Sequence, residues 1–251
     1  MQKCACVSEK MVPMSDTCIL IPTYNNAGTI AGVVRRALAQ GLSVIVVDDG
    51  STDGTSAALA GLDVTVLRQD PNRGKGIALR TGLRAARERG FRYAVTLDAD
   101  GQHYPEDVPA LLAAGGPRTL VVGSRNLSAD GMPSGNTFAN KFSNFWFALQ
   151  TLHRLPDTQT GFRLYPLESL PSLWLMTARY EAELTLLVFS AWRGLRLIPV
   201  PVRVAYPEDR VSHFRPLADF SRISLLNTGL CLLALVYGYP SMLLRKLFKN
   251  R

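Results

Sequence analysis

Residues 43–55 read Ser-Val-Ile-Val-Val-Asp-Asp-Gly-Ser-Thr-Asp-Gly-Thr, an apolar run followed directly by two carboxylates and a glycine. Residues 44–47 are all β-branched, which favours a strand that is buried on both faces. Asp48-Asp49-Gly50 ends this strand, and we expect a short helix after Asp53. A buried strand that leads through a glycine turn into a helix is the building unit of a sheet with helices on both faces.

The rest of the chain repeats this alternation. The pattern predicts further strands at 18–22, 64–67, 93–97, 120–122 and 197–204, and helices at 29–39, 75–89, 138–152 and 180–192. Prolines interrupt the strand at 197–204, so we expect it at an edge of the sheet. Continuous apolar strands separated by helices predict an α/β fold with a mostly parallel sheet.

Four polar residues lie just past expected strand ends: Asn25, Asp49, Asp98 and Arg125. In open α/β sheets, ligands bind beyond the carboxyl ends of the strands. The sequence therefore predicts that these side chains converge on one ligand-binding edge. At that edge, the Asp49 carboxylate could accept hydrogen bonds from a nucleobase or a ribose.

Leu97-Asp98-Ala99-Asp100-Gly101-Gln102 is the sharpest candidate site. Two carboxylates and an amide oxygen are hard oxygen ligands, which suit Mg²⁺ or Mn²⁺. Side chains at positions i and i+2 of a strand share a face, so Asp98 and Asp100 can approach one ion. Asp98-Ala99-Asp100 alone is also compatible with a solvated acidic turn, so the neighbouring motifs must distinguish the two interpretations.

Asn72-Arg73-Gly74-Lys75-Gly76 opens the helix expected at 75–89. Glycines at a helix N-terminus expose backbone N–H groups that favour phosphate oxygens, and Arg73 and Lys75 add positive charge. A plain helix-entry turn with surface charges explains the same residues equally well.

Several of these segments occur together, and in the same order, in glycosyltransferase family 2. The matching blocks are Ile21-Pro22-Thr23-Tyr24-Asn25, residues 46–55, residues 72–76 and residues 97–102. Two later blocks, residues 122–125 and 157–165, resemble the dolichyl- and polyprenyl-phosphate sugar synthase branch. The resemblance extends over about residues 18–220, nearly the whole chain.

The resemblance implies a GT-A fold and a UDP- or GDP-linked sugar as donor. It assigns donor contacts to a set of strand-end and loop residues: Pro22, Tyr24, Asn25, Asp49, Lys75, Asp98, Ala99, Arg210 and Ser212. Asp98, Asp100 and Gln102 match the metal and diphosphate positions, which implies Mg²⁺ or Mn²⁺ as cofactor.

Arg125 matches an arginine that holds the acceptor phosphate in the polyprenyl-phosphate branch. A phosphate acceptor is already ionised at neutral pH, so inverting transfer to it needs no general base. A hydroxyl acceptor would need a carboxylate base. Asp157 is the candidate for that catalytic role, and its plainer interpretation is an anchor of its loop.

The formal net charge of +8 suits an acidic partner, such as nucleic acid, anionic lipid or a phosphorylated substrate. The leading hypothesis is transfer of a sugar to a polyprenyl phosphate. The alternatives are transfer to a hydroxyl of a lipid or glycan, and a non-catalytic protein that binds nucleotides or nucleic acid. Basic and aromatic residues are not interleaved, so we expect no nucleic acid partner.

We expect three segments: a flexible segment at 1–16, a GT-A domain at 17–222 and an apolar membrane-associating helix with a basic tail at 223–251. Residues 223–244 carry no charge and are long enough to cross a bilayer. Crossing, lying at the interface, and packing inside the domain or a homodimer remain alternatives. The basic residues after this segment favour the cytoplasmic face of a membrane.

Overall fold

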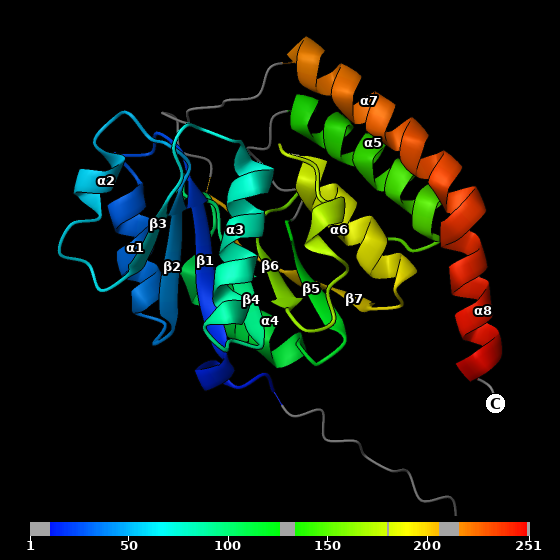
Figure 1. The fold of residues 1–251 in the computed structure, drawn as a ribbon, viewed down its shortest axis with the longest axis horizontal. Coiled ribbons are helices and arrows are strands. Elements are labelled where there is room, and N and C mark those ends of the chain that lie inside the picture. Colours follow the sequence, from blue (N-terminus) through cyan, green and yellow to red (C-terminus); the bar gives the residue numbers. More distant parts are fainter. Residues whose placement is uncertain (1–10, 126–133, 180, 206–215, 250–251) are drawn as a thin grey trace, which may run out of the picture.

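The computed structural model describes residues 11–125, 134–179, 181–205 and 216–249, apart from the side chains of 134–138, 216–222 and 249. Seven strands form one sheet in the order β3-β2-β1-β4-β6-β5-β7 (Figure 1). The strands are β1 Thr17–Thr23, β2 Ser43–Asp48, β3 Thr65–Arg68, β4 Tyr93–Thr96, β5 Thr119–Ser124, β6 Arg163–Pro166 and β7 Arg196–Pro201.

The sheet is parallel except for β6, which runs antiparallel to both of its neighbours, β4 and β5. The predicted α/β fold with a mostly parallel sheet is therefore confirmed. The Pro-interrupted strand β7 lies at the edge, as expected, because a proline cannot donate to a further strand. The six strands other than β6 bring their carboxyl ends to the same edge of the sheet.

Helices cover both faces of the sheet (Figure 1). They are α1 Ile30–Leu38, α2 Thr55–Ala58, α3 Lys75–Glu88, α4 Val108–Ala114, α5 Ser134–Thr151, α6 Glu181–Trp192, α7 Pro216–Leu233 and α8 Tyr239–Lys249. One buried cluster joins the sheet to α3, α5, α6 and α7, and a second joins its other face to α1 and α4. Alternate residues of β1 serve the two clusters, as expected for a strand between two layers.

Residues 11–16 differ from the expectation of a flexible segment. Val12 is 1% exposed, and its N–H donates to the carbonyl of Leu112 at 3.2 Å. Met14–Asp16 then forms a 3₁₀ turn that leads into β1. This part of the segment packs against the domain because the Val12 side chain has an apolar site to fill. Residues 1–10 lie outside the described residues.

The expected boundary at residue 222 falls inside a helix. The helix α7, the π-helical turn η4 (Ala234–Gly238) and the helix α8 follow one another without a break. Together they form one long helix, which lies beside α5 (Figure 1). Pro240 follows the π-helical turn. A proline removes an N–H group and its ring clashes with the preceding turn, so a widened turn is an understandable local adjustment.

Candidate active site

Lys75 links Asp98 to a carboxylate of a distant helix at the carboxyl edge of the sheet. The Nζ atom of Lys75, the first residue of α3, lies 2.6 Å from Oδ1 of Asp98 and 3.1 Å from Oε2 of Glu183 in α6. The three side chains are 22%, 25% and 10% exposed, in the order Lys75, Asp98 and Glu183. One ammonium group thus compensates two carboxylates at the base of the site.

The pKa of the Asp98 carboxyl follows from this arrangement. Burial works to raise its pKa, but the charge and hydrogen bond of Lys75, with smaller contributions from His103 and Arg125, hold it at about 2. Asp98 is therefore ionised at neutral pH, as a metal ligand must be. Burial also opposes the charge on Lys75, but Asp98 and Glu183 raise the pKa of its ammonium group above the ordinary value.

Glycine at position 161 is required by the Asp98 carboxylate. A Cβ atom at Gly161 would lie 2.5 Å from Oδ2 and 2.7 Å from Oδ1 of Asp98. The carbonyl of Gly161 accepts a hydrogen bond of 2.6 Å from Oγ1 of Thr96 in β4. The loop before β6 is thereby held directly against the carboxylate.

The other residues of the predicted metal site follow a tight turn. Asp98 and Asp100 are partly exposed, while Ala99 between them is 4% exposed. The backbone N–H of Gln102 donates to Oδ1 of Asp100 at 3.0 Å. Gly101 has a φ of +76°, in the left-handed region that glycine favours. The Ala99 carbonyl accepts from Oγ1 of Thr29 at 2.7 Å, so Ala99 fixes the turn through its backbone.

His103 also belongs to this site, although the sequence patterns do not single it out. It is 5% exposed, its Nδ1 lies 3.9 Å from Oδ2 of Asp98, and its Nε2 lies 3.4 Å from Oγ1 of Thr160. Its Nδ1 has no hydrogen-bond partner among the described residues. Burial lowers the pKa of the imidazole, against the opposing effect of the nearby Asp98 charge. Its position directly after Gln102, at the end of the predicted metal-binding segment, is the sequence feature that could have pointed to it.

The sequence patterns do not single out Glu183 either. It is buried in a helix that is otherwise mostly apolar. A carboxylate in an apolar helix needs a cation or a hydrogen-bond donor as partner, and this requirement is the sequence feature that could have identified Glu183.

Asp49 holds the loop that precedes Lys75. Its Oδ1 accepts from the backbone N–H of Arg73 at 2.9 Å, and its Oδ2 accepts from that of Gly74 at 2.7 Å. Asp49 is only 2% exposed, and its pKa is raised by burial, against the effect of these two hydrogen bonds. In the described conformation, this carboxylate organises the loop.

The glycines of the same loop allow a close approach of the segment before α6. A Cβ atom at Gly74 would lie 2.5 Å from the carbonyl oxygen of Ala178, and one at Gly76 would collide with the Thr177 carbonyl. The Gly76 N–H donates to the Ala178 carbonyl at 2.9 Å. These amides are therefore occupied by protein acceptors, which differs from the phosphate cradle that the two glycines suggested.

The loops after β1 and β2 are tied together. The N–H of Asn25 donates to Oγ of Ser51 at 2.9 Å, and its side-chain Oδ1 accepts from the N–H of Thr52 at 2.8 Å. Pro22 is buried within β1, and Tyr24 is half-buried at its end. The predicted nucleoside contacts thus lie at the same sheet edge as Asp49. Arg210 and Ser212 lie outside the described residues.

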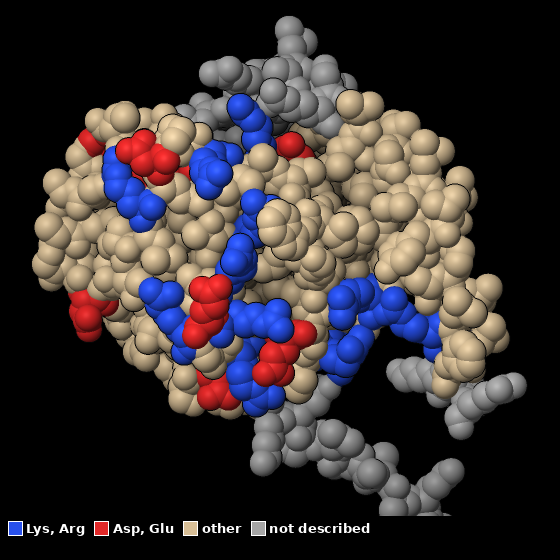
Figure 2. Space-filling view, viewed as in Figure 1, with Lys and Arg blue, Asp and Glu red and all other residues tan. Residues whose placement is uncertain are grey.

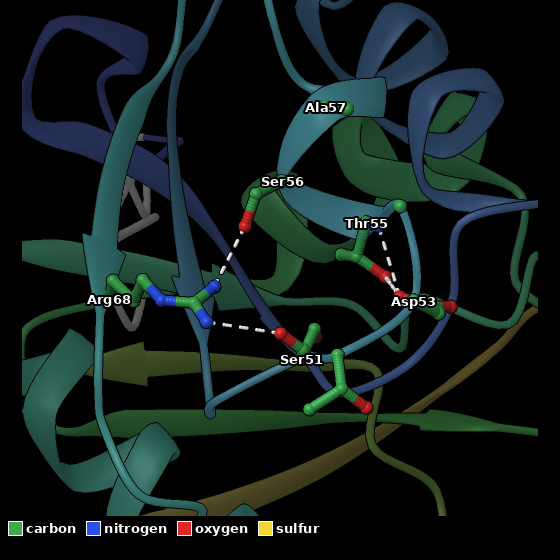
Figure 3. A pocket seen from close by; sticks show the side chains of 8 residues that line it. Ser51, Asp53, Thr55, Ser56, Ala57 and Arg68 are labelled. Carbon is green, nitrogen blue, oxygen red and sulfur yellow. Dashed lines mark hydrogen bonds between the residues drawn. The ribbon is translucent and has the colours of Figure 1, made fainter.

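A surface hollow of about 500 Å³ lies next to these loops and is lined by residues 51–57 and Arg68. Figure 3 shows the side chains that line it. The Arg68 guanidinium donates to Oγ of Ser56 at 2.8 Å and to the Ser51 carbonyl at 3.1 Å. It also lies 2.6 Å from Oδ2 of Asp48. These contacts stiffen the loop that lines the hollow, whereas Asp98 and Lys75 are not among its lining residues.

Arg125, which is partly exposed, pairs with the buried Asp157 at the end of β5. Nε of Arg125 lies 2.6 Å from Oδ2 of Asp157, and Nη2 lies 3.1 Å from Oδ1. Asn140 donates to Oδ1 of Asp157 at 2.8 Å, and the backbone N–H groups of Arg125, Gln159 and Thr160 also donate to this carboxylate. Burial works to raise the pKa of Asp157, but Arg125, Asn140 and Gln159 hold it below the ordinary value. A carboxylate so fully occupied fits the anchor interpretation better than that of a general base.

Comparison with known proteins agrees with the family suggested by the motifs. Residues 18–171 match the model of glycosyl transferase family 2. A UDP-N-acetylglucosamine–dolichyl-phosphate N-acetylglucosaminyltransferase of Methanococcus voltae is 30% identical over 76% of this chain and 86% of its own length. The polyprenol monophosphomannose synthase of Mycolicibacterium smegmatis is 32% identical over 80% of this chain and 81% of its own.

Solved structures support the fold. Glucosyl-3-phosphoglycerate synthase from Mycobacterium tuberculosis, crystallised with Mn²⁺, UDP and glucosyl-3-phosphoglycerate, superposes with a TM-score of 0.63 at 22% identity, covering 87% of this chain and 79% of that one. Mannosyl-3-phosphoglycerate synthase from Rubrobacter xylanophilus gives a TM-score of 0.60 at 18% identity, covering 94% and 75%. The GT-A fold implied by the sequence resemblance is confirmed.

Proposed function

The chain belongs to glycosyl transferase family 2, and from this membership and the site geometry we propose that it transfers a sugar from a UDP- or GDP-sugar to a polyprenyl phosphate at a membrane surface, with inversion. The observation that carries the acceptor class is the Arg125–Asp157 pair. The charge of Arg125 contributes to the low pKa of Asp98, so the two groups belong to one electrostatic site. Relatives named for polyprenyl- and dolichyl-phosphate acceptors support the same class.

On the donor side, Asp98, Asp100 and Gln102 would hold Mg²⁺ or Mn²⁺. The donor set fits, because it consists of hard oxygen atoms and Asp98 is ionised. Among the described residues, no group of three or more His, Cys, Asp and Glu side chains gathers as a metal cage. A site with few protein ligands is typical of Mg²⁺ completed by substrate phosphates. The bound ion would supply positive charge to the leaving diphosphate.

Lys75 and Glu183 prepare Asp98 for this role. Lys75 keeps the Asp98 carboxylate charged and fixes one of its oxygens. Glu183 fixes the ammonium group from the other side. Such preorganised charges are effective because they need no rearrangement as the transition state forms.

On the acceptor side, a phosphate needs orientation more than proton removal. The Asp157 carboxylate accepts hydrogen bonds from two nitrogen atoms of the Arg125 guanidinium and so fixes its orientation. A guanidinium held in this way suits bidentate contact with an oxyanion. A hydroxyl acceptor would need a base, and the crowded Asp157 carboxylate is poorly suited to that task. This comparison favours a phosphate acceptor over a lipid or glycan hydroxyl.

Purified protein incubated with a panel of UDP- and GDP-sugars, polyprenyl phosphate and Mg²⁺ or Mn²⁺ tests the proposal. We expect a sugar-phosphate lipid product that requires the divalent ion. If product forms only with a polyprenol or a glycan hydroxyl, the phosphate-acceptor hypothesis is wrong and the hydroxyl alternative holds. Failure with every donor, together with salt-sensitive binding of nucleic acid, would favour the non-catalytic alternative.

A further inference from the structure

The long helix α7–η4–α8 is fixed lengthwise to the catalytic domain. Its inward residues recur every three or four positions and form one stripe along the helix: Asn227, Leu230, Ala234, Gly238 and Ser241. Asn227, Leu230 and Ala234 are at most 4% exposed. The stripe covers about four turns, so the helix is docked along its side.

Specific contacts with α5 and α6 hold this stripe. Nε2 of Gln150 donates to Oδ1 of Asn227 at 3.0 Å, and both side chains are buried. A Cβ atom at Gly238 would lie 2.5 Å from the Trp192 ring, so the helix backbone packs directly on the indole. Oγ of Ser241 donates to the Trp192 carbonyl at 3.3 Å. Detaching the helix would therefore expose a buried amide pair and a large aromatic side chain.

The opposite side of the helix is apolar and exposed. Leu225, Leu232, Val236, Leu243 and Leu247 are each between 59% and 76% exposed. The neighbouring helix α5 exposes Phe145 and Leu149, and Leu152 directly after it is also exposed. The surface over α7 in Figure 2 is largely free of charged side chains. Continuous exposed apolar surface of this kind marks an interaction site.

A group of arginines adjoins α8. Nη2 of Arg118 donates to the Arg193 carbonyl at 3.0 Å, and a Cβ atom at Gly194 would lie 3.2 Å from Nη1 of Arg245. No salt bridge within the described part of the chain includes any of these three arginines. Figure 2 shows Lys and Arg side chains gathered beside this end of the helix.

We propose that the protein docks on a bilayer with the axis of α7–α8 parallel to the membrane plane, its outward apolar stripe in the lipid, and Arg118, Arg193 and Arg245 on the phosphates of anionic lipids. The segment Ile223–Phe248 is long and apolar enough to cross a bilayer, but the docked inward stripe ties it to the catalytic domain. Crossing would require the contacts of Asn227 and Trp192 to be broken. An anionic bilayer supplies hydrocarbon for the outward stripe and negative charge for the arginines beside α8.

The inference adds an orientation to the proposed function, which already places the enzyme at a membrane. Its test uses vesicles without donor, acceptor or divalent ion. A failed docking result would therefore leave the transfer reaction untouched, and a failed transfer assay would leave the docking result untouched.

Depth measurement with nitroxide labels separates lying from crossing. The labels are placed singly at Leu225→Cys, Val236→Cys and Leu247→Cys, in a chain whose Cys4, Cys6 and Cys231 are serine. Neighbouring labels are about 16 Å apart along the helix axis. We expect the same shallow depth for all three in vesicles with anionic lipid. A crossing helix would bury the central label most deeply in a core of about 30 Å. That result, or labels that remain in water, would overturn the proposal.

Charge reversal tests the arginines. We expect the double variant Arg118→Glu/Arg193→Glu to bind anionic vesicles about 10-fold more weakly or worse, since each basic residue near the surface contributes about 1 kcal/mol. Binding to neutral vesicles should change little. Arg84→Glu/Arg87→Glu on α3 makes the same change in net charge elsewhere and should retain binding. If both double variants lose vesicle binding equally, the proposed contact between the arginines and lipid phosphates is wrong. Leu232→Asp/Val236→Asp should lose binding to both vesicle types, and retained binding would exclude the apolar stripe.

Discussion

The ammonium group of Lys75 lies 2.6 Å from the Asp98 carboxylate, although the two residues come from different strand-to-helix connections. Lys75 begins α3, and Asp98 follows β4, which pairs with β1 on the far side from β2. Their contact therefore joins the loop expected to meet the diphosphate with the turn expected to hold the metal.

Replacing Lys75 by methionine removes the charge that offsets the burial of Asp98. The pKa of Asp98 should then rise from about 2 toward and beyond its ordinary value. We expect kcat/KM to fall about 100-fold, the scale for losing one preorganised charge in an active site. The acid limb of the pH–rate profile should also move to higher pH, which a pH series of kcat/KM measures.

The sign of the pH effect on stability follows from the same shift. A carboxyl whose pKa is lowered by folding contributes stability above its ordinary pKa of 3.8, and this contribution is lost as pH falls toward about 2. Urea unfolding between pH 2 and 6 should show a steeper acid loss in the native protein than in Lys75→Met. Lys75→Arg, which keeps the charge, is the matched control. Parallel curves for all three proteins would contradict the pairing.

Asp157→Asn tests the anchor role against the role of general base. The substitution keeps the shape but removes the charge that aligns Arg125, so we expect the KM for acceptor to rise more than the KM for donor. Breaking a buried ion pair costs about 3 kcal/mol of stability, so thermal unfolding must be measured as well. A general base would show a different signature, in which kcat falls and its pH dependence is lost. Arg125→Lys, which retains a cation, should give a smaller rise in the acceptor KM than Arg125→Ala.

The strand-end residues were predictable because parallel strands share an edge. The motifs of 97–102 and 122–125 therefore appear together in the structure, as their positions after β4 and β5 required. The predicted strands and helices of the first half also occur within one or two residues of their expected ends. Hydrophobic periodicity determines such elements locally, so sequence reasoning reaches them.

Partnerships across the fold were less accessible to sequence reasoning. Nothing local assigns Glu183 to Lys75, because the contact depends on how α6 packs against α3. The glycines at 74 and 76 suggested a phosphate cradle, whereas they make room for the segment at 177–178. The antiparallel entry of β6 and the short helix α4 also went unpredicted. Each depends on contacts between segments that are distant in the sequence.

Gly161→Ala tests the contact between the loop before β6 and the Asp98 carboxylate. The new methyl group would lie 2.5 Å from Oδ2, so the carboxylate or the loop must move. We expect about a 100-fold loss of kcat/KM, because displacements of about 1 Å are costly in a preorganised site. Gly32→Ala on α1 has nothing within 4 Å of the new methyl group and should keep full activity. Normal activity of Gly161→Ala would show that the Asp98 carboxylate can move without cost.

Asp100→Ala tests the metal assignment apart from catalysis. Asp100 is partly exposed at a turn, so its loss should leave the thermal unfolding temperature nearly unchanged. In the native protein, we expect Mn²⁺ to tighten the binding of UDP or GDP measured by calorimetry. The variant should lose this tightening by at least about 10-fold, the lower end of the effect of disturbing a metal site. Asp63→Ala removes an exposed carboxylate outside the site and should behave as the native protein. Undiminished Mn²⁺-dependent binding and turnover in Asp100→Ala would move the metal to other ligands, while loss in both variants would trace the effect to overall charge.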